Sequence, residues 1–210
     1  MAFQAAAEAL PYLLRAAGTT IWVSAAGMVL GQVLGAAVCL LRRGPFERVG
    51  AVYVSFFRGV PLLVQLLLVY YFLPRAGIDV PPLVAAIAAL GLASGAYVSE
   101  IFRGALRAVP AGQVEAAVTL GFPTSAIWRR VLLPQAARIA LPSLVNELIL
   151  LLKASSLIST VGVTELTRAS HSYAATTYRP LEIYSCAGLI YLAISLVLAG
   201  AGQLAERRFA

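Results

Sequence analysis

The fold of this chain is decided by an interval that reads Gly112-Gln-Val-Glu-Ala-Ala-Val-Thr-Leu-Gly121 and continues to Pro134. Residues 113–120 are helix formers, and Glu115 falls in the first turn of the expected helix, where a carboxylate favours the positive helix end. Gly121 gives the backbone freedom to turn, and Pro123 can be the first residue of a second short helix. The interval therefore predicts two short helices meeting at a glycine; we call residues 112–134 the knob.

The composition indicates a membrane protein. The chain has 210 residues, of which 60% are hydrophobic, and a mean hydropathy of +0.86. A soluble domain of this size rarely needs so much apolar surface. Its formal net charge of +7 argues only weakly for nucleic-acid binding, because the basic residues are scattered around apolar runs and do not gather on one polar face.

Apolar stretches on both sides of the knob are long enough to cross a bilayer as helices. We expect five transmembrane spans, at about residues 19–41, 51–73, 80–106, 138–163 and 183–205. Residues 3–15 are expected to lie at the membrane interface, and residues 162–182 to form a polar loop. Arg58, near the start of the second span, can reach the lipid headgroups. The sequence predicts an all-α integral membrane protein with a single transmembrane domain over residues 1–210.

The distribution of basic residues predicts the orientation. The side that carries the knob collects most of the arginines: Arg42, Arg43, Arg48, Arg58, Arg103, Arg107, Arg129, Arg130, Arg138, Arg207 and Arg208. The other side has only Arg15, Arg75, Arg168 and Arg179. By the positive-inside rule the richer side is cytoplasmic. The N-terminus is therefore expected outside, with the knob and the C-terminus in the cytoplasm.

Several motifs carry a resemblance to a known family. Glu115-Ala116-Ala117, Leu120-Gly121 and Leu132-Leu133-Pro134 resemble the EAA motif of ATP-binding-cassette (ABC) importer permeases. Three further stretches resemble the polar-amino-acid branch, the permeases of the histidine and glutamine importer type: Phe57-Arg-Gly-Val-Pro-Leu-Leu-Val-Gln65, Ala96-Tyr-Val-Ser-Glu-Ile-Phe-Arg-Gly104 and Asn146-Glu-Leu-Ile-Leu-Leu-Leu-Lys153. The likeness extends from about residue 19 to the C-terminus. The knob departs from the family at Pro123, where relatives usually carry Ser or Thr.

The resemblance implies a type I importer permease in a bacterial inner membrane. It implies a second permease subunit, identical or related, an extracytoplasmic solute-binding protein, an amino-acid substrate and cytoplasmic ATPase subunits. The ATPase would dock on the knob, as coupling helix, at Glu115, Ala116, Ala117, Leu120 and Gly121. The chain has no glycine-rich Walker loop, and its only lysine, Lys153, does not follow a glycine. ATP and Mg²⁺ are therefore expected on the partner ATPase, and this chain is expected to carry no cofactor, metal or catalytic residue.

Polar residues inside the spans are candidates for the translocation path, because they tend to face the protein interior. Six are singled out: Ser94, Tyr97 and Glu100, which recur every three residues on one helix face, and Asn146, Lys153 and Ser156 in the fourth span. A zwitterionic substrate needs an anionic and a cationic group, which Glu100 and Lys153 could supply. Alternatively, Glu100 pairs with Arg103 and Lys153 binds backbone carbonyls. Relatives often have Asn in place of Ala93 and an acid in place of Ala154, which leaves the substrate open.

Other small or isolated residues have simpler interpretations. Gly27, Gly31 and Gly35 form a small-residue row suited to close helix packing. Cys39 and Cys186 lie in apolar runs and are interpreted as buried hydrophobic residues. His171, the only histidine, is expected to be solvated in the external loop.

Three other functions remain open. An ion-gradient-driven transporter or channel would predict inverted repeats or broken helices, and no internal repeat is visible in the sequence. A membrane scaffold without transport would leave the polar stripes unexplained. The third alternative is an ABC permease for another small solute.

Overall fold

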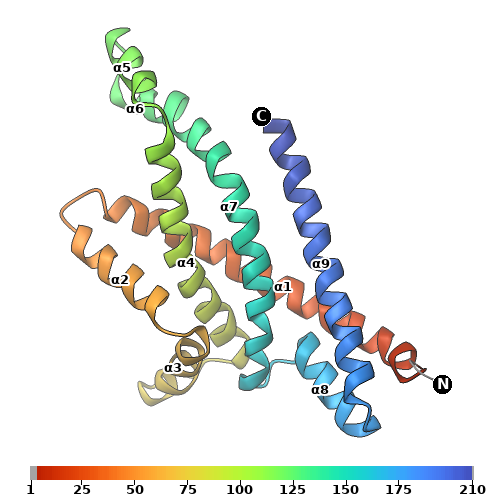
Figure 1. The fold of residues 1–210 in the computed structure, drawn as a ribbon. Helices are drawn as coiled ribbons and strands as arrows, with labels where there is room; N and C mark the ends of the chain where they lie inside the picture. The colour runs from red at the N-terminus through yellow and green to blue at the C-terminus, as the bar shows by residue number, and fades with distance from the viewer. Residues whose placement is uncertain (1–3, 210) are drawn as a thin grey trace.

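A computed structural model describes residues 4–209, and these residues form helices joined by short turns, with no strand among them (Figure 1). The prediction of an all-α fold is confirmed. In chain order the elements are α1 (Gln4–Leu41), α2 (Glu47–Gly59), α3 (Leu62–Arg75), α4 (Pro82–Ala108), α5 (Ala111–Thr119), α6 (Thr124–Ile127), the π-helical turn η1 (Trp128–Leu132), α7 (Leu133–Ala154), the 3₁₀ helix η2 (Ser155–Val161), α8 (Leu166–Thr177) and α9 (Pro180–Phe209).

The second expected span is broken. Four stretches of the described chain are long and apolar enough to cross a membrane as single helices, and α2 and α3 make a fifth only as a pair bent by 108°. The predicted second span, residues 51–73, is therefore not one continuous helix. Pro61 causes the break, because it has no N–H and forces the residue before it out of the helical region. Val60 accordingly has an extended backbone, with φ of −99° and ψ of 135°.

The first span begins earlier than expected. Residues 3–15 were predicted as a separate interfacial segment, but from Gln4 onward they continue into the 38-residue helix α1, which contains Pro11. Ala9 and Leu13 on this part of α1 are fully buried in a cluster with residues of α8 and α9. This burial explains why the helix persists despite a proline. α1 runs diagonally behind α4, α7 and α9 (Figure 1).

The interface of α1 with α4 uses the predicted small-residue row. A Cβ added at Gly31 would lie 2.8 Å from Ser94 Cβ, and one at Gly35 would lie 2.6 Å from Val98 Cγ1. The row continues on the other helix, where a Cβ at Gly95 would lie 2.9 Å from Leu34 Cβ. Side chains of each helix therefore pack directly against glycines of the other, and the prediction of close packing is confirmed.

The predicted polar loop, residues 162–182, contains α8. Its sequence looked like a loop because its exposed face is polar, but Leu166, Ala169 and Ala174 are buried against α1 and α9. Glu165 precedes the helix, and its carboxylate accepts hydrogen bonds from the first backbone N–H groups, as an N-cap should. His171 is exposed on α8. Neither cysteine forms a disulfide; Cys39 is buried and Cys186 partly buried.

Candidate functional site: a projecting helix pair and a polar groove

The knob projects as a short helix pair, α5 and α6, from the ends of α4 and α7 (Figure 1). α5 ends in a left-handed residue, Gly121, with φ of +76°. The N–H of Phe122 donates to the carbonyl of Ala117 at 3.0 Å, and the N–H of Gly121 donates to that of Val118 at 2.9 Å. These two bonds are the Schellman arrangement, which needs a residue free to adopt positive φ. The predicted role of Gly121 follows directly from this geometry.

Two details of the knob differ from expectation. α5 begins at Ala111, so Glu115 lies beyond the first turn and does not face the free N–H groups of that helix. Pro110 is the N-cap residue, with an extended backbone, and its carbonyl accepts the N–H of Gln113 at 3.0 Å, which closes the first turn of the helix. Pro123 stands one residue before α6, in an extended conformation, and is not the first helical residue.

The surface of the knob is partly apolar. Glu115 and Ala116 are exposed, whereas Ala117 is buried. Leu120 is 76% exposed and Val118 is 60% exposed. Of the two alanines, only Ala116 can contact a partner, because Ala117 packs inside the knob. A large apolar side chain next to an acid, at the tip of a projecting element, is typical of a protein-binding surface.

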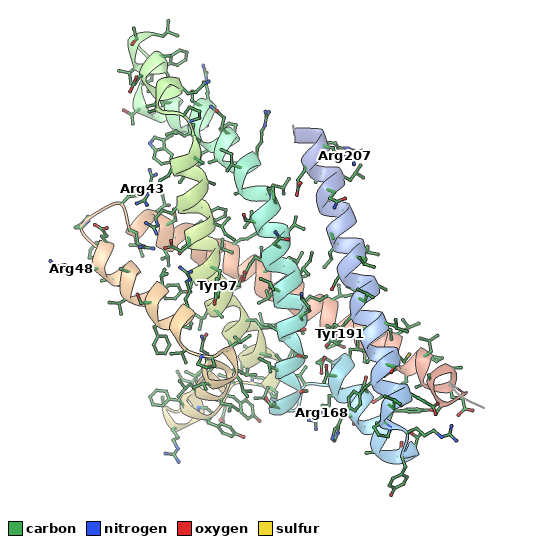
Figure 2. All side chains as sticks on the ribbon, viewed as in Figure 1. Arg43, Arg48, Tyr97, Arg168, Tyr191 and Arg207 are labelled. Carbon is green, nitrogen blue, oxygen red and sulfur yellow. The ribbon has the colours of Figure 1, made fainter. Side chains whose placement is uncertain are left out.

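A polar groove lies between α4, α7 and the bend that joins α2 to α3. It has a wider part of about 550 Å³ and a narrower part of about 310 Å³. Tyr97, Glu147 and Leu150 line both parts, and Tyr97 is labelled midway along α4 in Figure 2. The guanidinium of Arg58, in the last turn of α2, lies 5.5 Å from the centre of the Tyr97 ring. Arg58 therefore reaches the groove rather than the headgroups, which corrects the prediction for this residue.

The structure brings together four of the six residues predicted for the translocation path. Ser94, Tyr97, Glu100 and Asn146 line the groove. Lys153 and Ser156 line neither part. Lys153 is exposed beyond the groove on α7, and the Ser156 hydroxyl donates to the Lys153 carbonyl at 2.8 Å.

Glu100 is held by two arginines. Its carboxylate forms ion pairs with Arg42 of α1 and with Arg103 one turn along α4. Both oxygens are used, so Glu100 ties α1 to α4. This favours the structural interpretation of Glu100, including its expected pairing with Arg103, over a free anionic group in the path.

Three groove residues were not predicted as site residues. Glu147 is buried and lines both parts of the groove. Arg58 was assigned to the headgroups. Gln65 is buried in the narrower part and fastens the bend. The only signal for Gln65 and Glu147 was a polar side chain within an apolar run, which is costly in a membrane unless it faces the interior.

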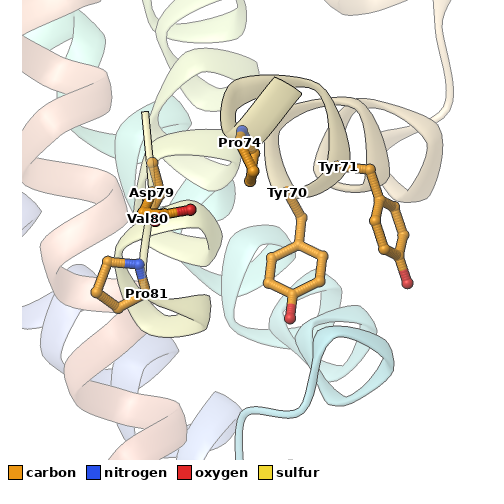
Figure 3. A pocket seen from close by; sticks show the side chains of 6 residues that line it. All are labelled: Tyr70, Tyr71, Pro74, Asp79, Val80 and Pro81. Atoms are coloured by element: carbon orange, nitrogen blue, oxygen red, sulfur yellow. The ribbon is translucent and has the colours of Figure 1, made fainter. Parts of the chain in front are cut away.

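A separate hollow of about 500 Å³ lies at the far end of α3. Tyr70, Tyr71 and Pro74 from α3 and Asp79, Val80 and Pro81 before α4 line it (Figure 3). The hollow is far from the knob along the fold, since it lies at the opposite end of α4. Asp79 therefore belongs to the surface that the sequence places outside the cell.

Comparisons with known proteins give the same family. Residues 13–210 match the family model described as binding-protein-dependent transport system inner membrane component. The arginine transport system permease protein ArtQ of Bacillus subtilis (strain 168) is 38% identical over 210 residues, covering 98% of this chain and 96% of that protein. The glutamine transport system permease protein GlnP of Escherichia coli (strain K12) is 38% identical over 205 residues, covering 95% and 94%.

Solved structures share the fold. One, described as an amino acid ABC transporter with histidines, has a TM-score of 0.93 and 34% sequence identity, and the match covers 99% of both chains. A MetNI methionine ABC transporter in an inward-facing conformation has a TM-score of 0.81 at 24% identity, over 95% of this chain and 97% of that one. The resemblance seen in the sequence is confirmed, as is the type I importer permease fold. This chain belongs to the family of binding-protein-dependent transport system inner membrane components, the permease subunits of ABC importers.

Proposed function

We propose that this chain is the permease subunit of an ATP-driven importer of polar amino acids and forms the pore with a second permease subunit. The knob carries the proposal. Leu120 is 76% exposed at the turn of a helix pair that projects beyond the bundle, and Glu115 lies on the preceding helix, α5. The amino-acid substrates in the names of the relatives support the substrate class.

The partner at the knob is a cytoplasmic ATPase. The apolar tip inserts into a groove of that subunit while Glu115 meets a basic side chain. ATP and Mg²⁺ bind to the ATPase and not to this chain. ATP binding closes the ATPase pair, draws the two knobs together and turns the pore outward; hydrolysis reverses the change, as in a two-state equilibrium biased by differential binding.

The knob and the C-terminus face the cytoplasm, and the N-terminus faces outward. The arginine distribution supports this orientation even when Arg58 is removed from the count, since the knob side keeps most of the remaining arginines. The hollow lined by Tyr70 and Asp79 then faces outward, where a solute-binding protein delivers its cargo.

The substrate crosses along the groove, past Ser94, Tyr97 and Asn146. Arg58 and Glu147 supply the cationic and anionic groups that a zwitterion needs, in place of Lys153 and Glu100. Two observations support this exchange: Arg58 and Glu147 line the same wider part of the groove, and Glu100, which also lines it, is already paired with Arg42 and Arg103.

Reconstitution tests the proposal. The chain is co-purified with its ATPase and binding protein, and amino-acid uptake and ATP hydrolysis are measured in liposomes. Leu120→Asp is expected to detach the ATPase, and Glu115→Ala to leave ATP hydrolysis uncoupled from uptake. Glu47→Ala, which removes an exposed acid on α2 away from the knob, is the matched control and should behave as wild type. Uptake that needs only an ion gradient would support a secondary transporter instead, and uptake of other solutes but no amino acid would overturn the substrate class.

A further inference from the structure

A second cavity, which we call the apolar cavity, lies between α1, α4 and α7 at the base of the knob. Its volume is about 250 Å³, and it shares only Ala105 with the polar groove. The side chains that line it are apolar except for the thiol of Cys39 and the indole N–H of Trp128. These walls suit a hydrocarbon, so the cavity is not a second site for a polar substrate.

The apolar cavity has a buried floor and an exposed rim. Cys39, Ala105 and Ala136 are buried and form the floor. Leu40 of α1 and Leu133 of α7, which also line it, are 64% and 51% exposed. The cavity therefore opens on the outer surface of the helix bundle, where a membrane-spanning protein meets the hydrocarbon chains of the bilayer.

Trp128 closes the end of the cavity nearest the knob, because it begins η1, directly after α6. Tryptophan is enriched at the level of the lipid headgroups, where its ring is apolar and its N–H is solvated. The guanidinium of Arg43, just beyond the end of α1, lies 4.5 Å from the centre of the Trp128 ring (Figure 2). A cation therefore lies at the headgroup end of a cavity that fits hydrocarbon.

Two further arginines adjoin the lining residues along the chain. Arg107 follows Leu106, and Arg129 follows Trp128. Like Arg43, both are exposed, and none of the three forms an ion pair with a residue of the described chain. No acidic side chain is among the described residues that line the cavity. The positive charge at this end is therefore available to a ligand.

This charge distinguishes between three occupants of the cavity. A neutral apolar molecule, or an apolar side chain of the second permease subunit, would fill the walls but leave the arginines without a partner. An anionic phospholipid fits both parts, because an acyl chain enters the cavity while the phosphate pairs with a guanidinium group. Basic pockets between transmembrane helices on the cytoplasmic side are typical sites for anionic headgroups.

We propose that the apolar cavity binds an acyl chain of an anionic phospholipid, with the headgroup phosphate held by Arg43. Only the assignment of this lipid to the cytoplasmic leaflet rests on the orientation proposed above. Trp128 belongs to η1, which connects the knob to α7. A lipid bound here packs between η1 and the end of α1, so it stabilises the base of the knob and is not a transported substrate.

Brominated lipids test the proposal, because bromine on an acyl chain quenches the fluorescence of a tryptophan that it contacts. Trp22→Phe leaves Trp128 as the only tryptophan of this chain. The assembled complex is placed in phosphatidylcholine nanodiscs with increasing fractions of phosphatidylglycerol or phosphatidylcholine carrying the same brominated chains. A complex with both tryptophans replaced by phenylalanine gives the background from partner subunits.

We expect half-maximal quenching at about a fivefold lower fraction of brominated phosphatidylglycerol than of brominated phosphatidylcholine, the preference that one arginine near an anionic headgroup provides. Equal fractions for the two lipids would mean ordinary contact with surrounding lipid and would overturn the site. No quenching by either lipid would mean that another subunit covers the cavity, which also overturns it. This comparison needs no variant of the cavity itself.

A larger side chain at the rim should close the cavity. Ala36 and Ala37 are neighbours on α1 and both are exposed, but only Ala36 lines the cavity. Ala36→Phe is expected to abolish the preference for phosphatidylglycerol, and Ala37→Phe, the matched control, to keep it. The same response in both variants would contradict the location.

Removing the cation should abolish the headgroup preference without closing the cavity. Arg43→Gln is expected to make the two brominated lipids quench Trp128 at equal fractions. Arg48→Gln is the matched control, because Arg48 is an exposed arginine on α2 that contacts neither Trp128 nor the cavity (Figure 2). A fivefold preference that survives in Arg43→Gln would contradict the role of this arginine. Amino-acid uptake, measured separately, tests the transport function and not this site.

Discussion

The hydroxyl of Tyr191 on α9 donates a 2.9 Å hydrogen bond to the fully buried carboxylate of Glu165, the residue that caps α8. The same carboxylate accepts the N–H groups of Thr167 at 2.8 Å and Arg168 at 2.7 Å. Beside it, the N–H of Leu166 donates to the hydroxyl of Thr20 on α1 at 3.1 Å. These bonds join three helices at one point, and Tyr191 lies close to α8 in Figure 2.

Removing the Glu165 carboxylate should loosen α8. Glu165→Ala leaves the N–H groups of Thr167 and Arg168 without their acceptor and leaves the Tyr191 hydroxyl with only the Thr167 hydroxyl as a partner, so we expect a loss of about 2–4 kcal/mol in the free energy of unfolding. Glu165→Gln keeps an acceptor oxygen and should lose less. Thermal unfolding of the purified complex measures both, and equal midpoints for wild type and Glu165→Ala would contradict the assigned role.

Stability should also depend on pH through this residue. Burial raises the pKa of the Glu165 carboxyl above its ordinary value of 4.5, although the hydrogen bonds from Thr167, Arg168 and Tyr191 oppose the shift. As pH rises past 4.5, the unfolded chain loses its proton before the folded one does, so stability falls until the folded group has also ionised. Unfolding midpoints measured across this range should decline in wild type, and the Glu165→Gln variant should lack that component.

The α1–α4 interface should not tolerate a methyl group at its centre. A Cβ at Gly35 would meet Val98 at 2.6 Å, so Gly35→Ala is expected to destabilise the protein by about 1–3 kcal/mol through overpacking. Gly18→Ala is the matched control on the same helix, because a Cβ there has no neighbour within 4 Å. The double variant Gly35→Ala, Val98→Ala should recover part of the loss. Additive effects in this cycle would argue against direct contact.

The turn of the knob should need a glycine for coupling. Gly121→Ala places a side chain at φ of +76°, at an expected cost of about 1–2 kcal/mol. Gly77→Ala has a similar local cost at φ of +80°, but at the far end of α3. We expect only Gly121→Ala to reduce the uptake driven by each ATP hydrolysed. The same reduction in both variants would indicate general destabilisation.

Neutralising Glu100 should reduce stability, whereas neutralising Glu147 should raise the KM for uptake. Glu100→Gln breaks the ion pairs with Arg42 and Arg103, so the free energy of unfolding should fall by about 1–3 kcal/mol. The KM for uptake should change little. Glu147→Gln should raise the KM for uptake, because Glu147 has no arginine partner in the structure described here and faces the groove. A higher KM in Glu100→Gln alone would restore Glu100 as the anionic group of the path.

Local backbone chemistry made the knob predictable. Gly121 and the two short helices follow from residue types whose effects act within one turn, and the glycine spacing on α1 needed only a partner of matching shape. The bend at Pro61 could not be predicted from the sequence pattern, because residues 51–73 have the length of one ordinary transmembrane span and apolar residues surround the proline. α8 was interpreted as a loop because its exposed face is polar and its buried residues are few and small.

The groove depended on tertiary contacts that spacing cannot provide. Four of the predicted path residues do line it: Ser94, Tyr97 and Glu100 because their three-residue spacing reflects a real face of α4, and Asn146 alone from the fourth span. The structure does not bring Glu100 and Lys153 together in the groove: Lys153 lies outside it, and Arg42 approaches Glu100 from α1, a helix distant in sequence. Arg58 reaches Tyr97 only because the chain turns immediately after it, and that turn was not foreseen.

α1 joins the two ends of the molecule. At 38 residues it is about 57 Å long, nearly twice the thickness of a hydrocarbon core. Its N-terminal part packs with α8 and α9, and its C-terminal part packs with α4 through the glycine row. One continuous helix therefore contacts α4 at one end and α8 at the other, so a displacement of α4 can be transmitted to α8 without passing through a loop.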